Sequence, residues 1–304
     1  MYDIASVTKV VGTLQALMYL AGTEQLNINK KLSFYLPSLK GTNKGALKIR
    51  RILAHQAGLP AYVWGEIRQT LFDANGRLRK ALFSTHPSPT YQHQLASDLY
   101  GATWLKELVW DCCVNTALRD KSWFKSYSYQ YSCVGFYFLH HLAEKLLEQP
   151  LDNFLEATFY RPLGLATLTY HPLHKLAQDR MAPTEKDNFF RQDLLQGMVH
   201  DPMAALYGGV VGNSGLFSNA NDLAIVLQMN LQDGYYGDQR YLQKGVVQSF
   251  AKKSFKDNRR GLGGTNRTST MPHLPLQYMP LKTAMTIVDL QGQPFGIRGH
   301  DEPV

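Results

Sequence analysis

A serine and a lysine three residues apart stand at the start of the first apolar segment of this 304-residue chain. The apolar residues that follow Ser6 and Lys9 recur with the period of a helix, which predicts a helix over residues 4–22. Residues three apart lie on one side of a helix, one turn from each other. A serine beside such an amine is suited to nucleophilic catalysis, because the amine can take or hold the serine proton. The alternative interpretation is a helix-capping serine beside a solvated lysine.

Further segments accompany this pair and favour the catalytic interpretation. An aromatic, serine-rich loop leads to Tyr131-Ser132-Cys133, and the apolar stretch behind it predicts a second helix over residues 133–148. The alternative interpretation of Tyr131 is an aromatic residue of the hydrophobic core. Two more segments complete the set: His55-Gln56-Ala57-Gly58-Leu59, and a glycine-rich stretch from Gly208 to Ser218 that contains Asn213 and Ser214.

In this order the motifs resemble those of the serine β-lactamase and penicillin-binding-protein superfamily, on its class C β-lactamase branch. The resemblance covers roughly residues 1–263, and local phrases are similar to the β-lactamase-like domain that some bacteria carry behind a β-N-acetylglucosaminidase domain. Three such phrases are Asp3-Ile4-Ala5-Ser6-Val7-Thr8-Lys9, Ala182-Pro183-Thr184-Glu185 and Val199-His200-Asp201-Pro202. The resemblance implies an α+β fold of the β-lactamase/transpeptidase type, in which helices pack on an antiparallel sheet. It also implies a parent protein of the periplasm or cell envelope, joined to a glucosaminidase domain.

The resemblance also suggests roles for individual residues. Ser6 would be the nucleophile that forms an acyl-enzyme, Lys9 would help to activate it, and Tyr131 would assist as general base or acid. Cys133 stands where the family usually has Asn or Asp, and a thiol is a weaker hydrogen-bond partner than either. The residues expected to contact substrate are Ser132, Cys133, Asn213 and Ser214.

The composition limits the partners of the chain. The formal net charge of +8 comes from scattered basic residues without a stripe of interleaved aromatics, so we expect no nucleic-acid binding. No apolar run is long enough to span a bilayer, and we expect no signal peptide before Ser6. The three cysteines form neither a disulfide framework nor a zinc site, and no residue set has metal-ligand spacing. We therefore expect no cofactor or metal, and a small-molecule or peptidoglycan-derived substrate.

Elsewhere, periodicity and turn residues predict mostly helices. His55 and Gly58 are expected to have structural roles. We expect tight backbone turns at Gly208, Gly209 and Gly212. His200-Asp201 is expected to lie in a loop that lines the site. Helices are expected over residues 49–55, 96–108, 151–160, 221–231 (capped by Ser218 or Asn219) and 246–253, with an irregular segment over 170–205.

Both ends of the chain depart from the family pattern. Almost nothing precedes Ser6, so the opening strands of the sheet are expected to be absent, and the third family motif, Lys-Thr-Gly or His-Thr-Gly, is not found. The prediction is an incomplete domain over residues 1–263 and an aberrant tail over 264–304. This tail permits a frameshift interpretation, because regrouped codons between Ala284 and Gly296 can encode a His-Ser-Gly-Phe-Thr-Gly stretch.

Two classes of function follow. The first is a β-lactamase-related serine hydrolase that acts on the amide or ester bond of a peptidoglycan peptide, a β-lactam or an ester. The second is a non-catalytic remnant that at most binds cell-wall material.

Overall fold

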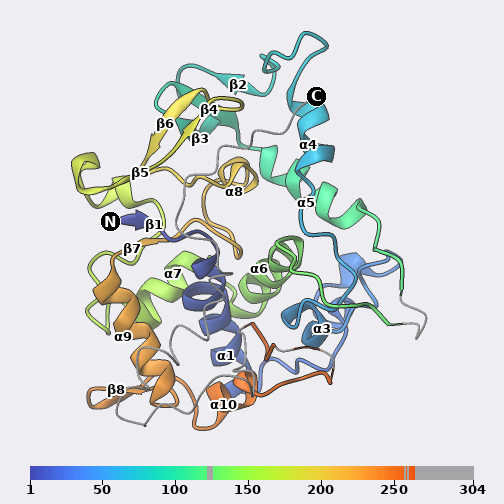
Figure 1. The fold of residues 1–304 in the computed structure, drawn as a ribbon, viewed down its shortest axis with the longest axis vertical. Helices are drawn as coiled ribbons and strands as arrows, with labels where there is room; N and C mark the ends of the chain where they lie inside the picture. Colours follow the sequence, from blue (N-terminus) through green and yellow to red (C-terminus); the bar gives the residue numbers. More distant parts are fainter. Residues whose placement is uncertain (122–125, 257, 259, 264–304) are drawn as a thin grey trace, which may run out of the picture.

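The computed structural model describes residues 1–121, 126–256, 258 and 260–263 and has an α+β architecture (Figure 1). Three longer helices and several short ones make up most of the fold, and the small antiparallel sheets lie towards its edges (Figure 1). The helices are α1 (Leu14–Gly22), α2 (Leu32–Tyr35), α3 (Ile49–Leu53), α4 (Trp64–Leu71), α5 (Leu105–Asn115), α6 (Val134–Leu147), α7 (Leu151–Leu155), α8 (Pro202–Leu206), α9 (Ala220–Leu231) and α10 (Val246–Ala251). The strands are β1 (Tyr2–Asp3), β2 (Phe83–Ser84), β3 (Tyr91–Ala96), β4 (Leu99–Ala102), β5 (Pro183–Asp187), β6 (Asp193–Gln196), β7 (Phe217–Ser218), β8 (Tyr235–Tyr236) and β9 (Gln239–Arg240).

The core lies where α1, α6 and α7 pack together near the centre of the molecule (Figure 1). Most of the apolar residues on α1 and α6 are buried, as the 3.6-residue period requires. A buried tyrosine connects the layers, since the Tyr160 hydroxyl donates to Val11 O at 3.1 Å. The segment that carries Ser6 and Lys9 is thereby held against the helices behind it.

All strand pairings among the described residues are antiparallel. The largest described sheet has three strands in the order β2-β4-β3, and the others are the pairs β1-β7, β5-β6 and β8-β9. The β1-β7 pair sets Tyr2 opposite Ser218 and Asp3 opposite Phe217. This pairing matters for the site, because it joins the start of the chain to the glycine-rich segment (Figure 1).

Several predicted helices are confirmed. Helical structure runs from Ala5 to Gly22, although it begins as a 3₁₀ turn (Ala5–Val7) and a π-helix (Lys9–Thr13) before α1. Helices α6, α9 and α10 match the stretches predicted over 133–148, 221–231 and 246–253, and the helix predicted over 151–160 is α7 followed by a π-helix. The Asn219 side chain caps α9 by accepting from Asp222 N at 2.8 Å.

Two predictions about secondary structure are wrong. Residues 96–102 belong to the β3-β4 hairpin, and the helix there begins only at Leu105. The segment 170–205, predicted to be irregular, contains the β5-β6 hairpin and α8. Both hairpins have register shifts that break the strict two-residue alternation by which a strand is identified.

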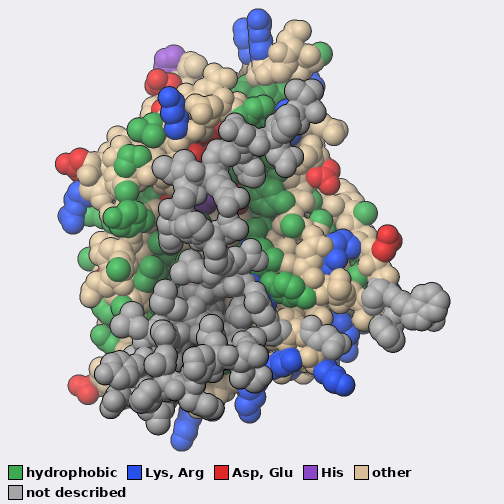
Figure 2. Space-filling model, in the orientation of Figure 1, with side chains coloured by type: hydrophobic (Ala, Val, Ile, Leu, Met, Phe, Trp, Pro, Cys, Tyr) green, Lys and Arg blue, Asp and Glu red, His purple; other side chains and the backbone are tan. Residues whose placement is uncertain are grey.

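The described surface adds two observations. No helix in the described ranges is long and apolar enough to cross a membrane. On the face drawn in Figure 2, the Lys and Arg side chains are scattered rather than gathered into one patch. The predicted tail over 264–304, with its frameshift interpretation, lies outside the described residues.

Candidate active site

Ser6 sits on a turn whose backbone is strained. Ala5 has a φ of 47°, a left-handed conformation that costs an L-residue about 1–2 kcal/mol. The Asp3 carboxylate supports this turn, since its Oδ1 accepts a hydrogen bond from Ala5 N at 2.8 Å. Ser6 itself is exposed, whereas Lys9 is buried. The result is an accessible hydroxyl held above a buried amine.

Lys9 donates to three acceptors at once. Its Nζ lies 2.9 Å from Ser6 Oγ, 3.0 Å from Asn213 O and 3.5 Å from Cys133 Sγ. An ammonium group has three protons and no lone pair, so these contacts satisfy its full donor capacity. Burial alone would lower the pKa of Lys9, but the neighbouring Cys133, Tyr131 and Asp201 outweigh burial and raise it. The geometry and the direction of this shift both describe Lys9 as an ammonium ion.

Tyr131 lies on the far side of the Lys9 amine. The Lys9 Nζ is 5.0 Å from the centroid of the Tyr131 ring, and the Arg260 guanidinium is 5.3 Å from the same ring. The His55 ring packs against Tyr131 with a centroid separation of 4.6 Å. The structure therefore brings the three residues predicted to be catalytic into one neighbourhood.

Ser132 and His55 hold the corner that carries Tyr131. Ser132 Oγ donates to Pro60 O at 2.6 Å and accepts from Gly135 N at 3.3 Å, while Ser132 N donates to His55 Nδ1 at 3.0 Å. Burial first, and then the cations Arg260 and Lys9, keep the pKa of His55 well below its usual value. His55 is thus a neutral loop anchor, as predicted. The Ser132 hydroxyl already has two protein partners, and its contact with substrate stays a prediction.

Asn213 and Ser214 form the third corner of the site. Both are buried, and Asn213 Nδ2 donates to Asp201 Oδ2 at 3.2 Å. Among the described residues, Asn213 Oδ1 and Ser214 Oγ have no hydrogen-bond partner. Gly212 makes this approach possible, because a Cβ at that position would lie 2.5 Å from Phe136 O. The backbone carbonyl of Asn213 contacts Lys9, and the predicted contact of Asn213 and Ser214 with substrate stays a prediction.

Sequence reasoning assigned no role to Asp3 and treated His200-Asp201 only as a loop that lines the site. Asp201 caps α8 by accepting from Ala204 N at 2.9 Å, and it supplies negative charge to the Lys9 environment. Asp3 accepts from His200 N at 2.8 Å and lies 3.0 Å from His200 Nδ1. Burial would lower the pKa of His200, but its contacts with Asp3 raise it. The acidic residue two positions before Ala5 was the available signal, since Asp commonly accepts from the N–H two residues later.

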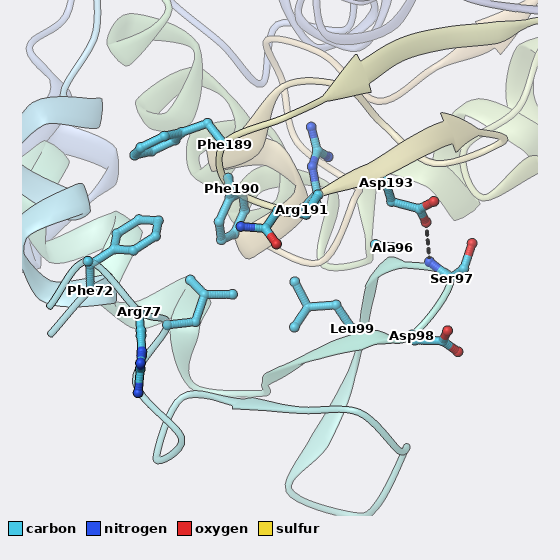
Figure 3. A pocket seen from close by; sticks show the side chains of 13 residues that line it. Phe72, Arg77, Ala96, Ser97, Asp98, Leu99, Phe189, Phe190, Arg191 and Asp193 are labelled. Carbon is cyan, nitrogen blue, oxygen red and sulfur yellow. Dashed lines mark hydrogen bonds between the residues drawn. The ribbon is translucent and has the colours of Figure 1, made fainter.

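A separate groove of about 450 Å³ lies away from these residues, at the tip of the β5-β6 hairpin (Figure 3). Phe72, Phe189 and Leu99 give it apolar walls, and none of the predicted site residues lines it. Within the described part of the chain, no cluster of His, Cys, Asp and Glu has the arrangement of a metal site. The chemistry of the candidate site therefore has to be argued from its serine, lysine and tyrosine.

Comparison with known proteins supports one family. The Beta-lactamase family profile matches residues 1–110 and 121–297. A protein of Salmonella typhimurium, named as a predicted D-alanyl-D-alanine carboxypeptidase, is 31% identical over 284 residues that cover 86% of this chain and 58% of that protein. The chain thus spans less than two thirds of the length of the curated relatives it matches.

Solved structures support the fold. A D-stereospecific amidohydrolase from Streptomyces sp. superposes with a TM-score of 0.58 at 17% identity, over 88% of this chain and 72% of the other. A penicillin binding protein from Bacillus halodurans gives a TM-score of 0.56 at 17% identity, over 87% and 70%. These likenesses confirm the predicted β-lactamase/transpeptidase-like fold.

Proposed function

The chain belongs to the Beta-lactamase family, and from that premise we propose that it is a serine hydrolase that forms an acyl-enzyme on Ser6. One observation carries the proposal: the exposed Ser6 hydroxyl accepts a hydrogen bond of 2.9 Å from a buried lysine that has two further acceptors. A helix-capping serine beside a solvated lysine would show neither the burial of Lys9 nor these contacts. The site geometry thus favours the catalytic interpretation of the Ser-x-x-Lys motif.

The proposed acylation step assigns a role to each residue. Ser6 Oγ attacks the carbonyl carbon of the substrate, and the Lys9 ammonium stabilises the negative charge that develops on Oγ as its proton leaves. Because Lys9 is an ammonium ion, the serine proton passes to another group. We assign this role to Tyr131 acting as a phenolate, because its ring lies 5.0 Å from the Lys9 Nζ. Tyr131 then returns that proton to the leaving amine or alkoxide. Water attacks the acyl-enzyme in the second half of the reaction and releases the acid.

The names of the relatives support one substrate class as the first to test. The curated relatives are named for a D-alanyl-D-alanine carboxypeptidase activity, so a peptide that ends in D-Ala-D-Ala is the first substrate to test. A β-lactam and a simple ester are the alternatives, since all three present a carbonyl to the same nucleophile. The link to a glucosaminidase domain and to the cell envelope stays a prediction.

Covalent labelling tests the proposal. The full chain is incubated with a fluorescent penicillin and, separately, with a fluorophosphonate, and the adduct is mapped by mass spectrometry. We expect the adduct on Ser6 and none in Ser6→Ala. An adduct on another serine would refute the assignment, whereas a cooperatively folded chain that gives no adduct with either reagent would favour the non-catalytic remnant. Release of D-alanine, compared with hydrolysis of an ester, then separates the substrate classes.

A further inference from the structure

One buried carboxylate joins the nucleophile turn to a segment far along the chain. Asp3 Oδ1 accepts from Ala5 N, and Asp3 Oδ2 accepts from His200 N at 2.8 Å and contacts His200 Nδ1 at 3.0 Å. The Asp3 side chain has no exposed surface. Three donors thus converge on a carboxylate that does not itself reach the reacting atoms.

The neighbouring Ala5 needs such support. Its left-handed φ of 47° is a conformation that residues with a Cβ rarely adopt, and such strain persists only where surrounding contacts enforce it. The hydrogen bond from Ala5 N to Asp3 is one such contact. Ser6 is the next residue, so the backbone angles of Ala5 determine where Ser6 Oγ lies relative to Lys9 Nζ.

The other end of this connection is anchored as well. The Arg191 guanidinium donates to Val199 O at 2.6 Å and to His200 O, and it forms an ion pair of 2.9 Å with Asp187. Its side chain is 1% exposed and points away from Phe72 and Leu99 of the separate groove (Figure 3). The backbone of His200 is therefore fixed from one side by Arg191 and from the other by Asp3.

We propose that Asp3 is a positioning residue, which keeps Ala5 in the left-handed conformation and thereby holds Ser6 Oγ on Lys9. This inference rests on the proposed role of Ser6. If Asp3 only stabilised the fold, its loss would lower the melting temperature without a specific effect on acylation. If it positions the nucleophile, its loss lowers the acylation rate constant of the folded protein.

The test compares Asp3→Asn with a matched control. The asparagine keeps the size of the side chain but replaces one acceptor oxygen by an NH2 donor. Whichever way the amide turns, it cannot accept from both Ala5 N and His200 N, so the connection between them is broken. Asp222→Asn is the control, because Asp222 is also a buried carboxylate with three donors, Thr167 N, Thr167 Oγ1 and Leu168 N. Fluorophosphonate labelling at a series of reagent concentrations gives the acylation rate constant and the half-saturating concentration separately.

We expect Asp3→Asn to lower the acylation rate constant about 10- to 100-fold with little change in the half-saturating concentration. Asp222→Asn should label at the wild-type rate once corrected for the folded fraction. The second variant, Ala5→Gly, adopts a positive φ without strain, so adding it to Asp3→Asn should recover part of the lost rate. Should Asp3→Asn fail to fold, Ala5→Val serves in its place, because a β-branched residue resists this conformation while Asp3 stays intact.

The outcomes separate the two proposals. Absence of label on wild-type Ser6 would refute the proposed function and this inference together. Wild-type labelling with an equally reactive Asp3→Asn would refute the inference alone. A rate that falls only in parallel with the folded fraction, and that Ala5→Gly does not recover, would make Asp3 a structural residue.

Discussion

Three segments contact the Lys9 amine, two of them through oxygen and one through sulfur. The Ser6 hydroxyl and the Asn213 carbonyl are oxygen acceptors at 2.9 and 3.0 Å, whereas the corner at the start of α6 offers the Cys133 sulfur at 3.5 Å. A thiol is the weakest of these three acceptors. The nucleophile segment and the glycine-rich loop therefore define the position of the Lys9 amine through their oxygen atoms. The Tyr131–Cys133 corner adds only a weak hydrogen bond to sulfur.

The largest effect is expected from the strongly bound segment. Ser6→Ala should abolish labelling, and Lys9→Ala should lower it by about 10³-fold or more, as removal of members of a catalytic unit does. Lys44→Met is the matched control, because Lys44 is also buried and binds backbone carbonyls at a distance from Ser6. If Lys9→Ala is folded by its thermal melt and still labels as fast as Lys44→Met, Lys9 has no role in acylation.

The next prediction tests how tightly the glycine-rich loop packs against the nucleophile segment and α6. A Cβ at Gly212 would meet Phe136 O at 2.5 Å and Thr13 Oγ1 at 2.9 Å, so Gly212→Ala should cost about 1–3 kcal/mol of stability. Gly65→Ala is the control, since a Cβ there meets no atom within 4 Å and lies in helix α4. Chemical denaturation measures both. Equal stability of the two variants would show that the segments are not tightly packed at Gly212.

A third prediction strengthens the weak corner. Cys133→Asn replaces the thiol by an amide with a carbonyl acceptor, and one hydrogen bond of about 1 kcal/mol corresponds to a roughly five-fold faster acylation. Cys133→Ala, which offers no acceptor, should show no gain. If the asparagine variant acylates no faster than the parent chain, the Cys133 thiol does not limit the acylation rate.

The smallest effect concerns pH. At pH values above about 6.5, the usual pKa of histidine, His55 is neutral in both the folded and the unfolded chain. Below that pH His55 is protonated in the unfolded chain but stays neutral in the folded chain. The free energy of unfolding therefore falls on acidification. His55→Gln keeps an acceptor for Ser132 N and should reduce the loss of melting temperature between pH 7 and pH 5. His200, whose pKa is raised, acts in the opposite direction in both proteins and cancels in this comparison.

The same comparison explains what could be predicted from the sequence. Ser6 and Lys9 are three residues apart, and the helix that joins them has a strong apolar period, so their contact follows from local geometry. The helix at α6 follows from the same kind of pattern. The hairpin of β3 and β4 does not, because its register shifts break the alternation of a strand, while Leu95, Leu99 and Ala102 stand at spacings of i, i+4 and i+7 that also fit a helix.

The contacts that complete the site could not be predicted in this way. Asn213 contributes its backbone carbonyl, an atom that every residue type has, so its identity carries no signal for the contact with Lys9. The Asp3–His200 contact joins residues 197 positions apart, and no periodicity relates them. The family resemblance indicated that these segments matter, but only the fold shows which of their atoms are in contact.

The distance along the chain between Lys9 and its Asn213 partner also orders events in time. The two residues are 204 positions apart, so Lys9 is synthesised well before this part of its environment. At about 5–20 residues per second, roughly 10–40 s pass before the ribosome adds the carbonyl that Lys9 needs. During that interval Lys9 lacks one of its three acceptors, so the hydrogen bonds that hold its amine are complete only after the glycine-rich loop has been made.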